Sequence, residues 1–290
     1  MYGNSVAHVL YERTRRRASD FTGDFGRPPC LAALVVGTDP ASRSIVRLKQ
    51  NRCRQVGIDA RIIELAASIT TEELVDTIRA LSDDGGVDGI VVQDPIPSTI
   101  DQRAAFDAIC PTKDVNGVTT ASFAAAAYDR PAFRSCTPAA IMTLLNTYRV
   151  PLVGAHAVVV GADDALGPPL CMMLLTAGAT VTCTDTRAQG AAELVATADV
   201  VITGTGVPGS IPGAWIRAGA VVLDAGTGHN GLGDVEFDTA IERASLLAPA
   251  TSGVGPLAVA LLLAQTMDAA LPSDDDPADR DDLLNPRAPT

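Results

Sequence analysis

The sequence LAALVVGTDPASRSIVRLK, residues 31–49, decides the fold of this chain. It opens with an apolar run that ends at Gly37, a pattern typical of a strand buried on both faces of a parallel sheet. A Gly-Thr-Asp-Pro turn follows, and residues 41–55 then predict a helix that Gly57 ends. The stretch therefore predicts one strand, turn and helix unit of an α/β sheet.

The elements after this stretch repeat the same alternation. Residues 60–65 predict a second strand, residues 71–81 a helix and residues 89–92 a third strand. Strands that alternate with helices form parallel sheets with right-handed crossovers, and ligands bind beyond the carboxyl ends of such strands. The turns after Val36 and Val92 are therefore the places where a site is expected.

A second α/β domain is expected in the C-terminal half. Residues 157–160 predict a strand, a glycine turn follows, and residues 167–176 predict a helix, so this segment resembles a Rossmann unit. Thr137 as N-cap and Pro138 as first residue predict a helix that leads into this domain. Further strands are predicted at residues 180–184, 200–203 and 220–224 and near Leu246.

We therefore predict an α/β protein of two domains, a three-layer N-terminal domain and a Rossmann-like C-terminal domain. The N-terminal domain covers residues 1–137 and is completed by residues 253–271, where a long apolar helix is expected to return to it. The Rossmann-like domain covers residues 138–252. Residues 272–290, rich in aspartate and proline, are expected to form an acidic disordered tail.

Composition excludes several kinds of partner and site. The formal net charge of -12 argues against binding to nucleic acid or to an anionic membrane surface. The longest apolar run is too short to span a bilayer, and the N-terminus lacks the apolar core of a signal peptide. Six cysteines without a C-x-x-C pair and three histidines give no zinc spacing. We expect a cytoplasmic protein with reduced thiols and no metal site.

Lys49 is the first candidate for catalysis, because it and Lys113 are the only lysines in a chain whose other cations are arginines. An ammonium group can transfer a proton, whereas a guanidinium stays charged. The alternative is that Lys49 is an ordinary solvated helix residue. Gln93 is the second candidate, since Pro95 and Pro97 hold it at a strand end. A simple proline-stiffened loop is the alternative there.

The turn between Gly161 and Gly167 is the candidate nucleotide site, although its glycines do not match G-x-G-x-x-G. Asp185 follows at the end of the next strand, where it would accept hydrogen bonds from an adenosine ribose, as in NAD-binding domains. A plain turn aspartate is the alternative. Asp163 and Asp164 stand where a pyrophosphate would approach, and they oppose its binding unless they cap the helix or point outward.

Taken in order, five stretches of the chain resemble the motifs of one family. The family is that of the bifunctional methylenetetrahydrofolate dehydrogenase/methenyltetrahydrofolate cyclohydrolases, and the resemblance extends to about residue 270. It implies a homodimer, paired through the nucleotide domain, that binds a tetrahydrofolate-type substrate and NAD, or alternatively NADP. Residues 37–49 are similar to G-x-D-P-A-S-x-x-Y-V-x-x-K, 92–97 to V-Q-L-P-L-P, 113–117 to K-D-V-D-G, 136–138 to C-T-P and 253–256 to G-V-G-P.

The resemblance also implies roles for individual residues. Lys49 and Gln93 would act on the one-carbon centre of the folate, with Lys49 the group most tied to hydrolysis of the methenyl ring. Contacts to the substrate are expected from Ile45, Pro95, Asn116, Gly253 and Pro256. Contacts to the nucleotide are expected from Gly161, Asp163, Gly167, Asp185, Thr205 and Gly206.

Several ligand-facing positions depart from the family pattern. Ile45 replaces a tyrosine one helical turn before Lys49, which also disfavours a short-chain dehydrogenase with its Y-x-x-x-K pair. Asn116 replaces the second acid of K-D-V-D-G, which the family uses to hold the pterin. The cofactor turn lacks the arginine and serine of G-R-S-x-x-V-G-x-P, and residues 249–258 also differ from the family loop.

Three hypotheses remain open after these departures. The chain is a methylenetetrahydrofolate dehydrogenase with weak or absent cyclohydrolase activity, because Ile45 leaves Lys49 without its tyrosine partner. It is alternatively an enzyme on the same scaffold that acts on a different pterin or one-carbon substrate. The third hypothesis is a non-catalytic binding paralogue.

Overall fold

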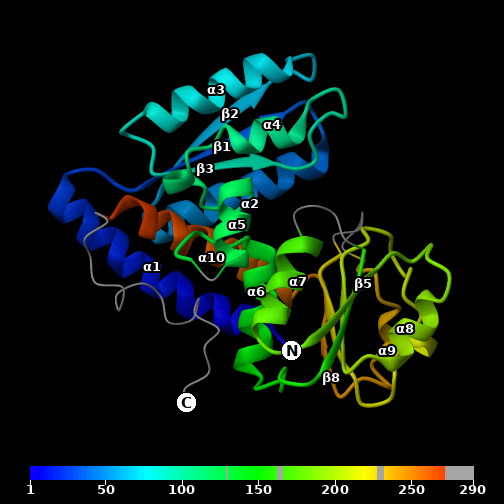
Figure 1. The fold of residues 1–290 in the computed structure, drawn as a ribbon. Coiled ribbons are helices and arrows are strands. Elements are labelled where there is room, and N and C mark those ends of the chain that lie inside the picture. Colours follow the sequence, from blue (N-terminus) through cyan, green and yellow to red (C-terminus); the bar gives the residue numbers. More distant parts are fainter. Residues whose placement is uncertain (129, 162–165, 227–231, 272–290) are drawn as a thin grey trace. The chain divides into compact units, whose positions relative to one another are not determined.

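The computed structural model describes residues 1–128, 130–161, 166–226 and 232–271. Their contacts divide them into two compact units, which Figure 1 draws. The N-terminal unit consists of His8–Arg134 and the described part of Val259–Arg280, and the C-terminal unit consists of Met1–Ala7 and Ser135–Ala258. Asp163 and the predicted acidic tail lie outside the described residues.

The N-terminal unit is built on a parallel sheet in the order β2-β1-β3. Its strands are β1 (Cys30–Val36), β2 (Asp59–Leu65) and β3 (Gly89–Gln93), so the three predicted strands are confirmed. All residues of β1 and β3 are buried, as their unbroken apolar runs predicted. Because β1 lies between the other two strands, the crossover from β1 to β2 and the crossover from β2 to β3 run in opposite directions across the sheet.

Helices cover both faces of this sheet and make three layers (Figure 1). On one face lie α3 (Thr71–Asp83) and α4 (Gln102–Asp107), whose Leu74 and Phe106 join a core with alternate residues of β1. The helix between β1 and β2 is α2 (Pro40–Val56), which packs on both of these strands. Right-handed crossovers that leave in opposite directions place their helices on opposite faces, so α2 lies on the other face from α3.

Local sequence fixes the ends of α2 and α3. Asp39 caps α2 by accepting the amide of Ser42 at 2.7 Å, and Gly57 ends the helix with a left-handed φ of 79°. α3 begins in a capping box, in which Thr70 and Glu73 each bind the other's backbone amide. α2 extends beyond its predicted range of 41–55 at both ends, whereas α3 begins as predicted and extends beyond residue 81 only at its C-terminal end.

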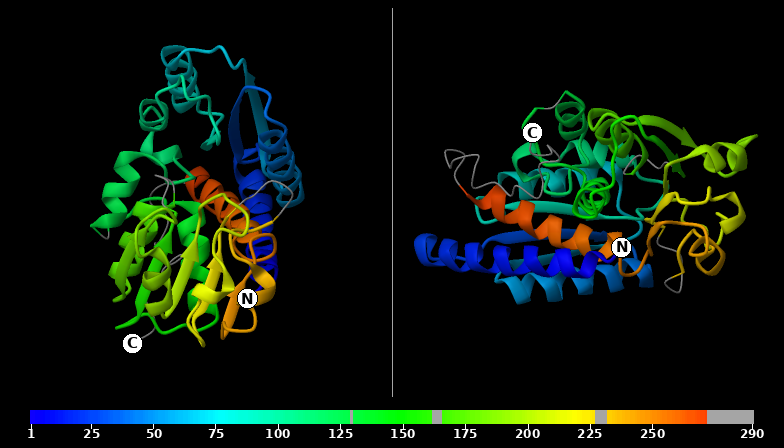
Figure 2. Two further views of the ribbon diagram at one scale, coloured as in Figure 1. Left: turned by 90° about the vertical axis from the view of Figure 1, so that its right-hand side faces the viewer. Right: turned by 90° about the horizontal axis from the view of Figure 1, so that it is seen from below.

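Two helices far apart in the sequence lie side by side in the N-terminal unit (Figures 1 and 2). They are the parts of α1 (Gly3–Phe25) and α10 (Val254–Ala270) that belong to this unit. Arg17 of α1 and the largely buried Asp268 of α10 form an ion pair at 2.6 Å. Gln265 of α10 also donates to the carbonyl of Val115 at 2.8 Å. The last helix therefore returns to the N-terminal unit, as predicted.

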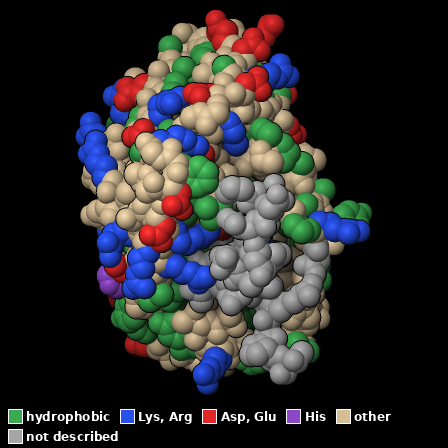
Figure 3. Space-filling view, turned by 90° about the vertical axis from the view of Figure 1, so that its left-hand side faces the viewer, with side chains coloured by type: hydrophobic (Ala, Val, Ile, Leu, Met, Phe, Trp, Pro, Cys, Tyr) green, Lys and Arg blue, Asp and Glu red, His purple; other side chains and the backbone are tan. Residues whose placement is uncertain are grey.

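Charged side chains of both signs share the face drawn in Figure 3. Several arginines of the N-terminal unit are paired with carboxylates, for example Arg15 with Glu12 at 2.9 Å and Arg61 with Asp84 at 2.6 Å. Ion pairs as exposed as these contribute little to stability, because solvent screens them. Among the residues that the structure describes, no helix is both long enough and apolar enough to cross a membrane.

The C-terminal unit is built on a second parallel sheet, in the order β5-β4-β6-β7-β8. Its core on one face joins strand residues such as Val158 and Val222 to Val195 and Ala240 of two helices. The strands are β4 (His156–Val160), β5 (Thr180–Thr184), β6 (Val200–Thr203), β7 (Val221–Asp224) and β8 (Leu246–Ala248). The helices are α6 (Cys136–Thr147), α7 (Gly167–Thr176), α8 (Ala191–Thr197) and α9 (Phe237–Ala240). The predicted Rossmann-like domain is therefore confirmed.

The start of α6 differs from the prediction. The helix begins at Cys136 with Ser135 as N-cap, so the prediction that Thr137 is the N-cap was wrong. The carbonyl of Ser135 already accepts the amide of Ala139 at 2.9 Å, which starts the helical hydrogen bonds two residues earlier. Pro138 still lies in the first turn, where the missing amide costs no helical hydrogen bond.

Candidate active site

Lys49 and Gln93 meet at the carboxyl ends of β1 and β3. The Nζ atom of Lys49 donates a hydrogen bond of 2.9 Å to Oε1 of Gln93. Gln93, the last residue of β3, is buried, and Lys49 on α2 is half-buried. In a sheet of order β2-β1-β3 the strand order reverses between β1 and β3, which is where ligands bind in open α/β sheets. The two residues that the sequence analysis predicts to be catalytic are therefore in contact at the carboxyl edge of the sheet, where a site was expected.

The surrounding backbone orients both side chains. The Nε2 atom of Gln93 donates to the carbonyl of Asp94 at 2.6 Å, which turns its Oε1 toward the ammonium. Ser42 donates from its hydroxyl to Oδ2 of Asp39 at 2.8 Å and lies 3.4 Å from the same carbonyl of Asp94. The first turn of α2 is thus tied to the end of β3, and Lys49 follows less than two turns later.

The residues four positions before and after Lys49 on α2 are Ile45 and Cys53. Ile45, one turn before it, is 36% exposed. Cys53, one turn after it, is fully buried, and burial raises the pKa of its thiol to about 12 although the nearby Lys49 lowers it. A thiol with so high a pKa is not a nucleophile at neutral pH. Neither Ile45 nor Cys53 therefore supplies a proton-transfer group beside Lys49.

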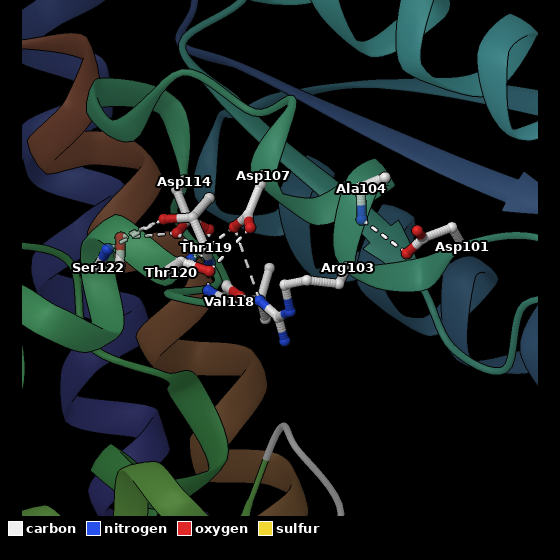
Figure 4. A network of polar contacts seen from close by, with 9 residues as sticks. All are labelled: Asp101, Arg103, Ala104, Asp107, Asp114, Val118, Thr119, Thr120 and Ser122. Atoms are coloured by element: carbon white, nitrogen blue, oxygen red, sulfur yellow. Dashed lines mark hydrogen bonds and ion pairs between the residues drawn. The ribbon is translucent and has the colours of Figure 1, made fainter.

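The turn that carries Asn116 is held by a buried carboxylate (Figure 4). Asp114 accepts the amides of Val118 at 3.1 Å and Thr119 at 2.9 Å and the hydroxyl of Ser122 at 2.7 Å. Burial raises the pKa of Asp114, and the hydrogen bond from Ser122 is the largest of the contacts that lower it. Asp114 therefore shapes the turn, and Asn116, half-buried, is the residue of this motif left to meet a ligand.

The second lysine has a structural position. Lys113 donates from Nζ to the carbonyls of Leu81 at 3.3 Å and Asp84 at 2.8 Å, at the carboxyl end of α3. A cation there satisfies terminal carbonyls and complements the helix dipole. Pro95, the remaining predicted substrate contact of the N-terminal unit, is exposed and follows a cis peptide bond from Asp94.

The C-terminal unit places its candidate nucleotide residues at the corresponding edge. Strand order reverses between β4 and β6, and the residues just beyond these strands, Gly161 and Thr205, are in contact. Gly161 has a φ of 77°, and a Cβ added to it would lie 2.7 Å from the backbone nitrogen of Thr205. Only glycine fits there. Gly167 is the first residue of α7, and Asp163 lies outside the described residues.

Asp185 has a partner that the sequence analysis missed. Its carboxylate binds the side chain of Arg187 through two hydrogen bonds of 2.8 and 3.1 Å and also accepts the backbone amide of Arg187 at 2.8 Å. The Arg187 guanidinium lowers the pKa of Asp185 to about 2. The site thus offers both an acceptor for ribose hydroxyls and, in the highly exposed Arg187, a cation for a phosphate.

Two predicted substrate residues lie in the other unit. Gly253 and Pro256 belong to Ser135–Ala258, where Gly253 donates to the carbonyl of Pro249 at 2.9 Å and Pro256 lies in the first turn of α10. Their role toward a substrate stays a prediction. Within the described ranges, no group of three or more His, Cys, Asp or Glu residues could hold a metal ion.

Comparisons with known proteins agree with this arrangement. Family models for tetrahydrofolate dehydrogenase/cyclohydrolase match residues 1–116 as the catalytic domain and residues 135–273 as the NAD(P)-binding domain. A protein of Salinispora arenicola called bifunctional protein FolD 1 is 52% identical over 270 residues, which are 93% of this chain and 97% of that protein.

Solved structures give the same relationship. The bifunctional FolD enzyme of Campylobacter jejuni, a methylenetetrahydrofolate dehydrogenase/cyclohydrolase, is 31% identical with a TM-score of 0.87, covering 92% of this chain and 96% of that one. The Trypanosoma brucei dehydrogenase-cyclohydrolase, solved with NADP and an inhibitor, is also 31% identical, with a TM-score of 0.88 and coverage of 93% and 96%.

Proposed function

The chain belongs to the tetrahydrofolate dehydrogenase/cyclohydrolase family, and on this premise we propose that it oxidises 5,10-methylenetetrahydrofolate to 5,10-methenyltetrahydrofolate with NAD(P). The observation that carries the proposal is the hydrogen bond between Lys49 and Gln93 at the carboxyl ends of β1 and β3. An ammonium oriented by an amide is suited to hydrogen-bond the nitrogens and oxygens of a folate and to move a proton. The comparisons favour neither a different substrate nor a non-catalytic role.

In this proposal Lys49 is the catalytic group and Gln93 orients it. NAD(P), when bound, would supply the acceptor for the hydride that the methylene carbon loses. Hydrolysis of the methenyl product adds water to the same carbon, and a nearby group must handle the proton that this water loses. Lys49 would accept that proton in its neutral amine form and become the ammonium, and Ile45 brings no hydroxyl to the same helix face to assist it. Cyclohydrolase activity is therefore expected to be weak or lost.

The substrate contacts are assigned on the same basis. Asn116 presents one amide oxygen and one amide nitrogen to the pterin, and Pro95 and Ile45 supply apolar surface. Gly253 and Pro256 are the contacts proposed from the C-terminal unit. The folate-binding domain is proposed to be residues 1–137 with 253–271, and the nucleotide domain residues 138–252.

The residues of the C-terminal unit fit a dinucleotide. Gly161, Gly167, Thr205 and Gly206 lie beyond strand ends or at the start of α7, the edge of the sheet where a dinucleotide binds in Rossmann-like domains. Asp163 is kept as a further contact. We propose NAD as the cofactor, because Asp185 is ionised and its Oδ2 atom, which accepts one hydrogen bond from Arg187, has a second lone pair for a ribose hydroxyl. NADP is the alternative, with its extra phosphate bound by Arg187.

We also propose a cytoplasmic homodimer paired through the nucleotide domain. β5 is an edge strand of its sheet, with Thr180 and Cys183 exposed, so its outer backbone groups can pair with a second copy. The exposed Val153 and Leu175 add apolar surface to the same unit. Light scattering coupled to gel filtration tests this proposal, and a monomer at micromolar concentration contradicts it.

A two-cofactor assay tests the activity. Purified protein is mixed with 5,10-methylenetetrahydrofolate and either NAD or NADP, and the reduced nicotinamide is followed by its absorbance. Turnover with NAD is expected. If neither cofactor is reduced, the dehydrogenase assignment is contradicted. Turnover with NADP alone contradicts the role given to Asp185.

A further inference from the structure

The carboxyl ends of β6 and β7 are joined through a buried carboxylate. Asp224, the last residue of β7, is 3% exposed. It accepts the hydroxyl of Thr203, the last residue of β6, at 3.2 Å and the amide of Gly226 at 2.9 Å. The same carboxylate accepts the amides of Asp234 at 3.2 Å and Val235 at 3.0 Å. Asp224 therefore fixes the segment that carries Asp234 against the ends of both strands.

Asp234 in turn holds the turn after β6 in place. Its side chain is fully buried, and its Oδ2 atom accepts the backbone amide of Thr205. The amide of Gly206 also acts on this carboxyl and lowers its pKa. Backbone contacts join the far end of the turn to the same segment, since Ile211 donates to the carbonyl of Asp234 at 2.9 Å. The turn over residues 205–211 is thus held at both ends by one short segment.

The turn held in this way borders the candidate nucleotide site. Thr205 packs against Gly161, where the strand order of the C-terminal sheet reverses. We propose that Asp234 is a positioning residue for nucleotide binding, whose buried carboxyl holds the Thr205 and Gly206 turn in the shape that receives the nucleotide. The inference rests on the proposed function, because it assigns a role at the same nucleotide site.

The energetic cost of this arrangement supports a functional reason for it. Burying a carboxyl is unfavourable unless hydrogen bonds compensate, and two are buried here. Burial raises the pKa of both Asp224 and Asp234, and the charge of Asp224 raises that of Asp234 further. An apolar pair would fill the same space without this penalty but would leave the amide of Thr205 without its acceptor.

Three variants separate positioning from simple stability. Asp234→Ala removes the acceptor, Asp234→Asn keeps an oxygen that can accept the amide of Thr205, and Val235→Ala weakens the same segment by opening space in the core. Dissociation constants for NAD and NADP are measured by calorimetry, with kcat at saturating nucleotide and the thermal midpoint of unfolding measured on the same preparations.

Asp234→Ala is expected to weaken nucleotide binding about tenfold with kcat largely retained, the loss that one hydrogen bond of this kind supplies. Asp234→Asn is expected to bind as the wild type does. Val235→Ala is expected to lower the thermal midpoint without weakening binding. Equal weakening in Val235→Ala, or an Asn variant as weak as the Ala variant, overturns the positioning role.

The control on the proposed function is the wild-type protein. If it binds neither nucleotide, the proposed function fails and this inference fails with it. If the wild type binds nucleotide and Asp234→Ala binds it equally well, the inference alone is overturned and the proposed function stands.

Discussion

The Nζ atom of Lys49 lies 2.9 Å from Oε1 of Gln93, although the two residues stand on different elements and 44 positions apart. The contact joins the middle of α2 to the last residue of β3. Both side chains therefore lie at the edge of the sheet where the strand order reverses, which is where we propose that the folate binds.

Removal of the Lys49 ammonium should abolish most of the hydrolytic activity. Lys49→Ala is expected to lower kcat for hydrolysis of methenyltetrahydrofolate by about 10²- to 10⁴-fold, the range of a general acid or base, because that step moves a proton whereas the hydride transfer does not. Lys113→Met is the matched control, because it removes the other lysine from the end of α3. That variant should lose about 1 kcal/mol of unfolding free energy and keep its kcat. Equal losses of kcat in the two variants would show that Lys49 acts only through stability.

Replacing Gln93 should affect Lys49 indirectly. Gln93→Ala removes the acceptor that orients the ammonium and is expected to lower kcat by up to about a hundredfold. Steady-state kinetics at saturating substrate measure this effect. The double variant with Lys49→Ala should be little worse than Lys49→Ala alone, because the two side chains act as one unit. Independent, multiplicative losses would contradict that coupling.

A tyrosine at position 45 should raise the hydrolytic activity. Ile45→Tyr adds a phenol one helical turn from Lys49, on the same face of α2. The rate of methenyltetrahydrofolate hydrolysis is expected to rise about tenfold or more, which is within the range of an added proton-transfer group. Ile45→Phe supplies the ring without the hydroxyl and should stay at the wild-type rate. An equal gain from phenylalanine would assign the effect to packing.

The pair formed by Asp185 and Arg187 should set the choice of cofactor. Asp185→Ala is expected to raise the KM for NAD about tenfold, since the ribose loses its acceptor. Arg187→Ala should raise the KM for NADP and leave that for NAD unchanged, and the pKa of Asp185 should return from about 2 toward 3.8 in a carboxyl titration by NMR. Arg217→Ala, which breaks a similar ion pair with Asp199, is the control and should change neither KM.

The buried Asp114 should make stability depend on pH in a defined direction. Its folded pKa is raised above the ordinary value of 3.8, so its contribution is fully present below pH 3.8 and is lost as pH rises through the folded pKa. The destabilisation caused by Asp114→Asn should therefore be larger at pH 3 than at pH 7, as measured by urea unfolding. If the difference in unfolding free energy between the wild type and Asp114→Asn instead grows as the pH rises, the hydrogen bonds to the carboxylate outweigh the cost of its burial.

Local sequence predicted the regular elements well because their signals are local. The bounds of α7 and β5 agree with the prediction, since an apolar period and flanking glycines define them within one short window. The start of α6 was missed, because Ser135 and Thr137 can both cap a helix and only the hydrogen bond to Ala139 distinguishes them. Boundaries therefore depended on contacts that no single window contains.

The candidate site was predictable in part. Because the chain has only two lysines, their scarcity drew attention to Lys49 and Lys113 equally. Only the three-dimensional contacts distinguish the lysine beside a strand end from the lysine at a helix end. Arg187 and Asp234 were missed for the same reason, because an ion pair and a buried acceptor depend on distances between side chains and backbone. Roles carried by tertiary contacts leave no periodic signal in the sequence.

The strand order of the two sheets has a consequence for how this chain can be altered. In both sheets the candidate residues project from one end of the strands, so the turns at the opposite end, such as residues 84–88 and 149–155, are free of the proposed chemistry. Peptide tags or reporter groups inserted into those turns should leave catalysis intact, provided that they spare contacts such as the pairing of Asp88 with Arg27.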